Sequence, residues 1–329
     1  MIYIFLLIII LMAIVLLQQS SFIKNRNKNY QKRLVEDSLK HIYDCEHKKI
    51  DSTSLSLSGS LSLSKEKTTK LIQSMLQKHL IKTSGNKLSL TDEGKNYALQ
   101  VIRIHRLWEK FLAEKTSVQE YDWHKIAEIE EHKTSIENAN KIAAQLGNPF
   151  VDPHGDPIPN EKGELIFQET VSLNEVKENN FVKVEHIEDE PKEIYQRIFG
   201  YGIFVGSILL VKKKSDEKIF LELNGKEISL SIVEADNINV SYVTDFISED
   251  VIPLTSLNID ESGIISFISN GIRGQQRRRL LDFGILPNTE ITARMKSINN
   301  DPTAYEVRGT LIALRKNQSD LIFIKKKEV

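Results

Sequence analysis

Hydrophobic residues recur at helical spacing in two stretches of the N-terminal third of the chain. The first runs from Gln31 to Cys45 and the second from Ser64 to His79, and in each the apolar positions return about every 3.6 residues. Ser64 is followed by charged residues, as in the first turn of a helix. We therefore predict two helices here. Their apolar positions are Leu34, Leu39, Ile42, Tyr43, Leu71, Ile72, Met75, Leu76 and Leu80.

The segment between these helices, residues 51–64, reads DSTSLSLSGSLSLS. Its composition is typical of disorder and its alternation of Leu and Ser is typical of a strand, but its place in the chain favours a helix. Residues 81–94 then read IKTSGNKLSLTDEG, which predicts two strands joined by a turn at Gly85 and Asn86. Three helices followed by a hairpin form a winged helix-turn-helix, which we predict for residues 30–100.

The helix predicted from Ser64 to His79 carries basic and polar side chains near its N-terminal end. In a winged helix-turn-helix this end enters the major groove of double-stranded DNA. Residues 31–100 contain twelve Lys and Arg against eight Asp and Glu, a positive surplus that suits a nucleic-acid partner. The alternative is an ordinary solvated basic face. The candidate DNA-binding residues are Lys65, Lys67, Thr69 and Lys70.

Histidine and glutamate residues recur at helical spacing between residues 105 and 132. His105 and Glu109 are four residues apart, and so are His124 and Glu128, so each pair shares one helix face. Imidazole and carboxylate groups without thiolate suit Mn²⁺, Fe²⁺ or Zn²⁺. The alternatives are two solvated helix faces or the site of a metallohydrolase. The candidate ligands in this region are His105, Glu109, His124, Glu128, Glu131 and His132.

Residues 1–17, MIYIFLLIIILMAIVLL, are uncharged and almost all apolar. A helix of this length just reaches across the hydrocarbon core of a membrane, and the basic residues that follow it place that flank in the cytoplasm. We predict a single-pass anchor over residues 1–23 that contacts the lipid of the cell membrane, with the soluble body in the cytoplasm. A cleaved signal peptide is the alternative, although no A-x-A-like cleavage site precedes Gln18.

The C-terminal half of the chain contains two similar copies of one pattern. Each copy predicts a strand, a short helix, a turn that contains Gly and Ile, and four short strands. Gly225 and Gly309 occupy matching hairpin ends. Short, closely spaced strands with glycine turns are typical of a small β-barrel. We predict two such domains, over residues 170–245 and 252–326.

The motif HRLWEKFL, followed by His124-x3-Glu128-x2-Glu131-His132 and by NPFVDPHGDPIP, resembles the diphtheria-toxin-repressor and manganese-transport-regulator family of metal-dependent repressors. The resemblance extends over residues 30–159. It implies that the DNA-binding domain is followed by an all-α domain, residues 101–160, that binds metal and forms a homodimer. The second C-terminal copy resembles the FeoA-type SH3-like domains that accompany ferrous-iron transporters, and the first copy resembles them more loosely.

The resemblance also implies two metal sites. Oxygen donors at Asp37 and Glu128 resemble those of manganese-type members, since iron-type members have Met and Cys at these positions. Manganese-type members also have a Glu where this chain has Lys40, and an ammonium group cannot ligate a metal, so we do not expect an adjacent pair of ions. The implied regulatory site consists of Asp37, Glu128, Glu131 and His132, and the implied second site, which matches iron-type members better, consists of His105, Glu109 and His124.

The predicted protein is an α+β multidomain chain. Its parts are a transmembrane helix, a winged helix-turn-helix, an all-α metal-binding and dimerisation domain, and tandem SH3-like β-barrels. We predict a transcriptional repressor with Mn²⁺ or Fe²⁺ as its cofactor, which binds a double-stranded DNA operator as a homodimer and controls metal homeostasis. The alternative is a membrane-anchored, metal-sensing accessory protein that regulates an iron or manganese transporter through its FeoA-like domains.

Enzymatic activity is not expected from this sequence. It contains no phosphate-cradling glycine loop and no recognisable catalytic constellation. Cys45 is the single cysteine, which excludes an intrachain disulfide and a cysteine-rich zinc site.

Overall fold

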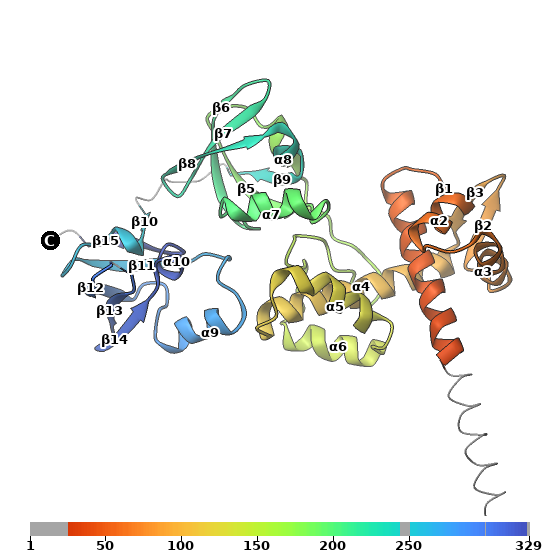
Figure 1. Ribbon diagram of the computed structural model, residues 1–329, viewed down its shortest axis with the longest axis horizontal. Helices are drawn as coiled ribbons and strands as arrows, with labels where there is room; N and C mark the ends of the chain where they lie inside the picture. The colour runs from red at the N-terminus through yellow and green to blue at the C-terminus, as the bar shows by residue number, and fades with distance from the viewer. Residues whose placement is uncertain (1–25, 244–250, 300, 328–329) are drawn as a thin grey trace, which may run out of the picture. The chain divides into compact units, whose positions relative to one another are not determined.

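The computed structural model describes residues 26–243, 251–299 and 301–327 (Figure 1). The chain divides into two compact units. The first unit comprises the residues up to His105 together with Lys125–Ala144 and Pro159–Leu165. The second comprises Arg106–His124, Gln145–Ile158 and the residues from Ile166 onward.

The first unit begins with the predicted winged helix-turn-helix. Its N-terminal helix covers residues 26–47, and three short strands form an antiparallel sheet in the order β1-β3-β2. The buried side chains of Leu39, Ile42, Leu57 and Met75 belong to one hydrophobic core. The elements after the N-terminal helix are β1 (Ser52–Thr53), α2 (Ser54–Ser60), α3 (Lys65–Gln77), β2 (Ile81–Ser84) and β3 (Lys87–Leu90).

The segment rich in Ser and Leu forms helix α2, so the strand alternative is wrong. Thr53 and Ser56 form a reciprocal capping box, in which each side-chain oxygen accepts a hydrogen bond from the backbone N–H of the other residue, at 3.1 and 2.9 Å. Leu57 is buried whereas Leu55 is 83% exposed. The capping box and the burial of Leu57 therefore stabilise this helix. The alternation of Leu and Ser does not indicate a β-strand here.

Gly94 permits a close approach between helix α4 (Asp92–Lys115) and the start of the hairpin formed by β2 and β3. A Cβ atom at this position would lie 1.8 Å from the backbone oxygen of Leu80. The backbone N–H of Gly94 donates to the hydroxyl of Thr91 at 3.0 Å, which caps the first turn of the helix. Any larger residue here would push the base of the hairpin away from α4.

Helices α4 and α5 (Glu120–Glu131) carry the predicted stripe of His and Glu residues, which ends at His132 in the turn after α5, and α6 (Ile136–Gln145) follows. Within the first unit, Arg103 on α4 donates hydrogen bonds to the carbonyl of Pro159 at 2.7 Å and to the side chain of Asn140 at 3.2 Å. Because Asn140 lies on α6 and Pro159 lies in the proline-rich connector, Arg103 ties three segments together.

The second unit contains the two predicted C-terminal copies, and their topology is identical (Figure 1). Each is a six-stranded antiparallel sheet, in the orders β4-β9-β5-β6-β7-β8 and β10-β15-β11-β12-β13-β14. The β-bulges recur at equivalent places, after Val184 and Val211 in the first copy and after Ile265 and Ala293 in the second. The predicted repeat is therefore confirmed at the level of sheet topology.

The strands and helices of each copy follow the same order along the chain. The first copy contains β4 (Val171–Ser172), β5 (Asn180–Ile187), α7 (Lys192–Gly200), β6 (Ile208–Lys214), β7 (Lys218–Leu223), β8 (Lys226–Ser231), α8 (Ile232–Asp236) and β9 (Ile238–Tyr242). The second contains β10 (Val251–Pro253), β11 (Ser262–Ile268), α9 (Gly274–Asp282), β12 (Glu290–Lys296), β13 (Thr303–Val307), β14 (Thr310–Leu314), α10 (Lys316–Ser319) and β15 (Ile322–Lys326). The one-turn helices α8 and α10 were not predicted.

No helix in the described part of the chain is long and apolar enough to cross a membrane. The anchor predicted over residues 1–23 lies outside the described residues.

Candidate metal centres and nucleic-acid interface

Three of the predicted ligands meet between the N-terminal helix and the end of α5. Asp37, Glu131 and His132 each offer one ligand atom, and these atoms lie within 4.8 Å of one another. The Nε2 atom of His132 lies 3.1 Å from Asp37 Oδ1 and 3.5 Å from Glu131 Oε1, without an aligned hydrogen bond to either oxygen. We call these three residues the regulatory cluster. Its nitrogen and oxygen donors suit Mn²⁺ or Fe²⁺.

Glu36 orients the imidazole of His132. It is buried, and its carboxylate contacts the Nδ1 atom of His132 at 2.8 Å and accepts a hydrogen bond from the hydroxyl of Tyr97 at 2.8 Å. Nε2 is therefore the nitrogen that faces Asp37 and Glu131. Burial lowers the pKa of His132, but the contacts with Asp37 and Glu36 outweigh it and raise this pKa to about 9.

The carboxylate of Glu131 is held from two sides. The side chain is fully buried, and Lys40 Nζ lies 2.9 Å from both of its oxygens. His105 Nδ1 lies 2.5 Å from Glu131 Oε2. Burial alone would raise the pKa of Glu131, but the hydrogen bond with His105 and the charge of Lys40 outweigh it, so the pKa lies below its ordinary value.

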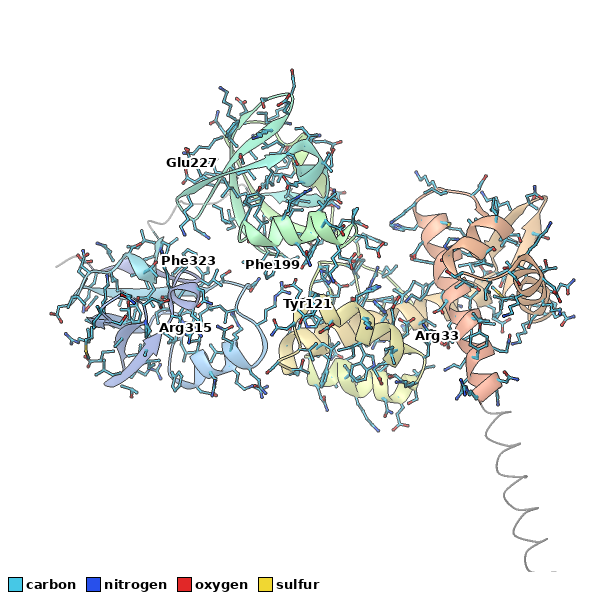
Figure 2. The ribbon with its side chains drawn as sticks, in the orientation of Figure 1. Arg33, Tyr121, Phe199, Glu227, Arg315 and Phe323 are labelled. Atoms are coloured by element: carbon cyan, nitrogen blue, oxygen red, sulfur yellow. The ribbon has the colours of Figure 1, made fainter. Side chains whose placement is uncertain are left out.

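The other members of the predicted regulatory site differ in exposure. Glu128 is exposed on α5 and lies outside the group of three. Asp37 is partly exposed, and Arg33 Nε lies 3.5 Å from its Oδ2. Figure 2 shows Arg33 on the N-terminal helix. The structure thus brings Asp37 to Glu131 and His132 and leaves Glu128 at the surface.

The residues of the predicted second site lie along α4 and at the start of α5. His105 and Glu109 are one helical turn apart on α4. The Nδ1 atom of His124 lies 3.1 Å from Glu109 Oε1, with Glu109 buried and His124 half exposed. The ligand atoms of His105, Glu109 and His124 lie within 4.8 Å of one another, and His105 also contacts Glu131.

A group of ligands that adds His154 and Asp189 to the predicted ligand Glu109 lies within the second unit. Glu109, His154 and Asp189 offer ligand atoms within 4.8 Å of one another; we call them the connector cluster. His154 is only 6% exposed, and its Nδ1 atom is buried without a hydrogen-bond partner among the residues that the structure describes. A buried imidazole nitrogen without a partner is costly unless a ligand completes it.

Local structure fixes the position of His154. Its backbone N–H donates to Asp152 Oδ1 at 2.8 Å, and the N–H of Asp156 donates to the same oxygen at 3.0 Å, as in an Asx-turn. The ring packs edge-on against Tyr195, with centroids 5.1 Å apart. The hydroxyl of Tyr195 in turn donates to Glu120. The motif DPHGDPIP, which carries His154, is the sequence signal that could have indicated this residue.

Buried charges surround the same connector. Burial raises the pKa of Asp152, and the neighbouring charge of Asp156 adds to this effect. Burial also acts to raise the pKa of Asp156, but the contact with His186 and the charge of Arg106 outweigh it and lower the pKa to about 2. Arg106 donates to the carbonyl of Pro157 at 2.5 Å and to Asp156 at 3.1 Å. The connector is therefore fixed by buried ionic and hydrogen-bonding contacts.

The four candidate DNA-binding residues lie on the exposed surface of α3. Ser64 caps this helix by accepting from the backbone N–H of Lys67, while the buried Leu71 and Met75 face the core. Lys70 Nζ lies 2.6 Å from Glu66, an exposed pair that solvent screens. The first two turns thus present Lys65, Lys67, Thr69 and Lys70 to solvent, as an interface with DNA requires.

Two family descriptions match consecutive parts of the chain. Residues 91–160 match "Iron dependent repressor, metal binding and dimerisation domain". Residues 171–242 and 252–326 each match "FeoA domain". The chain therefore carries one segment similar to that repressor domain, followed by two segments similar to FeoA domains.

Relatives of known description share parts of this sequence. The iron-dependent repressor IdeR of Mycobacterium leprae is 30% identical over 122 residues, which are 37% of this chain and 53% of the repressor. A probable metal transport system membrane protein of Chlamydia trachomatis is 34% identical over 85 residues, which are 26% of this chain and 19% of that protein. The chain thus spans about half the length of the repressor and a fifth of the membrane protein.

Solved structures of repressors resemble a larger part of the chain. A manganese-dependent transcriptional repressor in complex with manganese is 27% identical with a TM-score of 0.58, and the match covers 64% of this chain and all of that one. The structure of ScaR with bound Zn²⁺ is 27% identical with a TM-score of 0.52, and the match covers 64% of this chain and 99% of that one.

Proposed function

We propose that this protein is a metal-dependent, DNA-binding transcriptional repressor that controls metal-ion homeostasis. The observation that carries the proposal is the regulatory cluster, because it joins Asp37 of the winged helix-turn-helix to Glu131 and His132 of the metal-binding domain. The repressors among the relatives and solved structures support the same function. The proposal assigns the chain no catalytic step.

Mn²⁺ or Fe²⁺ is the proposed cofactor of the regulatory cluster. Carboxylate oxygens and an imidazole nitrogen are the donors that these ions accept, and Glu36 already directs Nε2 of His132 toward the two carboxylates. A bound divalent ion supplies positive charge that Asp37 and Glu131 can share. Glu128 lies on α5, four residues before His132, and would join the ligand set by a change of rotamer.

A second ion is proposed beside Glu109. The predicted set of His105, Glu109 and His124 and the connector cluster of Glu109, His154 and Asp189 share this glutamate, so one ion is expected there at a time. The unpartnered nitrogen of His154 favours the connector cluster. In that arrangement Asp189, which follows β5 of the first FeoA domain, would link this domain to the metal-binding domain.

The regulatory cluster couples metal binding to DNA binding through the N-terminal helix. Asp37 belongs to the helix that packs against α2 and α3 in the core of the winged helix-turn-helix, so drawing Asp37 toward Glu131 and His132 fixes the orientation of α3. Metal needs only to favour the DNA-competent arrangement over the others by about 1–3 kcal/mol to change DNA affinity by roughly 5- to 150-fold. In a homodimer, metal binding would fix the orientation of the α3 helices of both subunits.

An anchored protein that regulates a transporter is the second candidate function. The relative described as a probable metal transport system membrane protein supports it, as does the apolar run at residues 1–17. We propose that residues 1–23 anchor the chain in the cell membrane with its soluble body in the cytoplasm. Protease accessibility in cell fractions tests this arrangement, and recovery of the full chain only in the soluble fraction would refute it.

Selection from a pool of random DNA duplexes tests the repressor function. The full chain, kept in mild detergent, is incubated with the pool in EDTA, in Mn²⁺ or in Fe²⁺ without oxygen. We expect a single duplex motif to be enriched with Mn²⁺ or Fe²⁺ and none in EDTA, and Lys67→Ala with Lys70→Ala to abolish the enrichment. If no motif is enriched under any condition, the transporter function is favoured instead.

A further inference from the structure

Lys40 places a fixed positive charge on a metal ligand of the regulatory cluster. It lies one turn after Asp37 on the N-terminal helix, and its Nζ atom is 2.9 Å from both oxygens of Glu131. The Lys40 side chain is 21% exposed, whereas that of Glu131 is fully buried. With His105 on Oε2, both oxygens of Glu131 are already engaged by positive or hydrogen-bonding groups.

The charges around the cluster explain why a cation is needed there. Glu36 and Glu131 are buried and Asp37 is half-buried, so three carboxylates stand close to two imidazoles, those of His132 and His105. A buried carboxylate without a compensating charge is strongly destabilising. Lys32 reaches Glu36 at 3.4 Å but is largely exposed, which leaves Lys40 as the ammonium group in direct contact with the buried ligand Glu131.

We propose that Lys40 is an internal cation that competes with the regulatory metal for Glu131 and thereby sets the affinity of the cluster. This inference rests on the proposed function. The ammonium group stabilises the protein when no ion is present. A divalent ion that takes the oxygens of Glu131 must displace Lys40 or share them with it, and the two like charges repel each other. The protein therefore responds to metal at a higher concentration than the ligands alone would require.

The opposite role for Lys40 is to hold Glu131 in position for the ion. The two roles predict opposite signs. If Lys40 competes, replacing it by a neutral residue of similar length strengthens metal binding and weakens the metal-free fold. If it only positions Glu131, the same replacement weakens metal binding.

Calorimetric titration of the full chain with Mn²⁺ distinguishes these roles, using Lys40→Gln and the matched control Lys133→Gln. Lys133 is a suitable control because it is exposed, lies in the turn after α5 and pairs with the nearby Glu130. For Lys40→Gln we expect Mn²⁺ binding at the regulatory cluster to be about tenfold tighter than in the unaltered chain. We expect Lys133→Gln to leave it unchanged.

Thermal unfolding supplies a second measurement that does not depend on a titration. In EDTA, Lys40→Gln should unfold at a lower temperature than the unaltered chain, and saturating Mn²⁺ should remove this difference. Weaker Mn²⁺ binding by Lys40→Gln, or equal binding, would overturn the inference. If the unaltered chain binds no Mn²⁺ or Fe²⁺ at all, the proposed function fails instead.

Discussion

The regulatory cluster and the connector cluster both consist of carboxylates and an imidazole, but they differ in how their donors are engaged. In the regulatory cluster, the buried ligand Glu131 is already bound by Lys40 and His105. In the connector cluster, Glu109 contacts the imidazole of His124 at 3.1 Å. The Nδ1 atom of His154, like the Nε2 atom of His132, is buried with no hydrogen-bond partner among the described residues. The first arrangement suits a sensor whose affinity is lowered by the internal cation Lys40, and the second suits a structural ion.

The largest effect is expected from removing two ligands of the regulatory cluster at once. Glu131→Ala with His132→Ala should weaken Mn²⁺ binding at this cluster at least about 100-fold, because two inner ligands are lost. Calorimetric titration measures the loss. Glu137→Ala, an exposed residue on α6 that pairs with Lys141, is the control and should bind Mn²⁺ normally. Unchanged affinity in the double variant would show that this cluster is not a metal site.

A smaller effect is expected from changing the connector cluster. Asp189→Asn and His154→Gln should each weaken the binding of the ion at the connector cluster by roughly 10- to 100-fold. The regulatory cluster should stay occupied. The number of Mn²⁺ ions retained after dialysis reports this loss. Asp216→Asn, an exposed carboxylate of the same FeoA domain, should retain every ion. If His105→Gln and His124→Gln remove the ion while Asp189→Asn does not, the sequence-predicted second site is the occupied one.

Substitutions on α3 should weaken DNA binding without changing metal binding. Lys67→Ala should weaken binding to the selected duplex several-fold and reduce the slope of log affinity against log salt by about 1, since one phosphate contact is lost. Fluorescence anisotropy at several salt concentrations measures both quantities. Lys141→Ala on α6 is the control. Loss of Mn²⁺ binding in Lys67→Ala would contradict the separation of the two surfaces.

The smallest effect is expected for the ion pair beside the connector cluster. His186 Nε2 lies 3.7 Å from Asp156 Oδ2. Burial lowers the pKa of His186, but Asp156 outweighs it and raises the pKa above its ordinary value. The stabilisation is therefore complete below about pH 6.5 and is lost as the pH rises through the raised pKa. His186→Gln should cost about 1 kcal/mol of unfolding free energy at pH 6.

Chemical denaturation at two pH values tests this sign. The difference between His186→Gln and the unaltered chain should shrink between pH 6 and pH 9. A difference that stays constant over this range would mean that the charge of His186 contributes nothing, and that only its packing matters.

The sequence predicted those parts of the molecule whose residues share one element. Helical spacing placed Glu131 and His132 at the end of one helix and His105 one turn before Glu109, and the structure has these helices. The hairpin ends at Gly225 and Gly309 also agree, since both glycines have positive φ angles of 75° and 78°. Local periodicity and turn chemistry report such features directly.

Contacts between distant elements could not be predicted in the same way. Lys40 and Glu131 are 91 residues apart, and no periodicity within either helix indicates that they meet. His154 and Asp189 lie in irregular segments, where spacing carries no information about direction. Glu36 was overlooked because it is adjacent to Asp37 and points toward His132 and Tyr97 in the interior. Helix α2 was ambiguous because its cap, rather than its hydrophobic pattern, sets it.

Metal dependence of DNA affinity in the full chain is the most direct test of the central claim. Fluorescence anisotropy of the selected duplex is recorded while Mn²⁺ or Fe²⁺ is added to protein first freed of metal with EDTA. We predict that the affinity rises by roughly 5- to 150-fold as the regulatory cluster fills, and that Glu131→Ala with His132→Ala removes the rise while leaving the basal affinity intact. An affinity that is the same in EDTA and in saturating Mn²⁺ and Fe²⁺ would contradict the claim that the Asp37–Glu131–His132 cluster controls DNA binding.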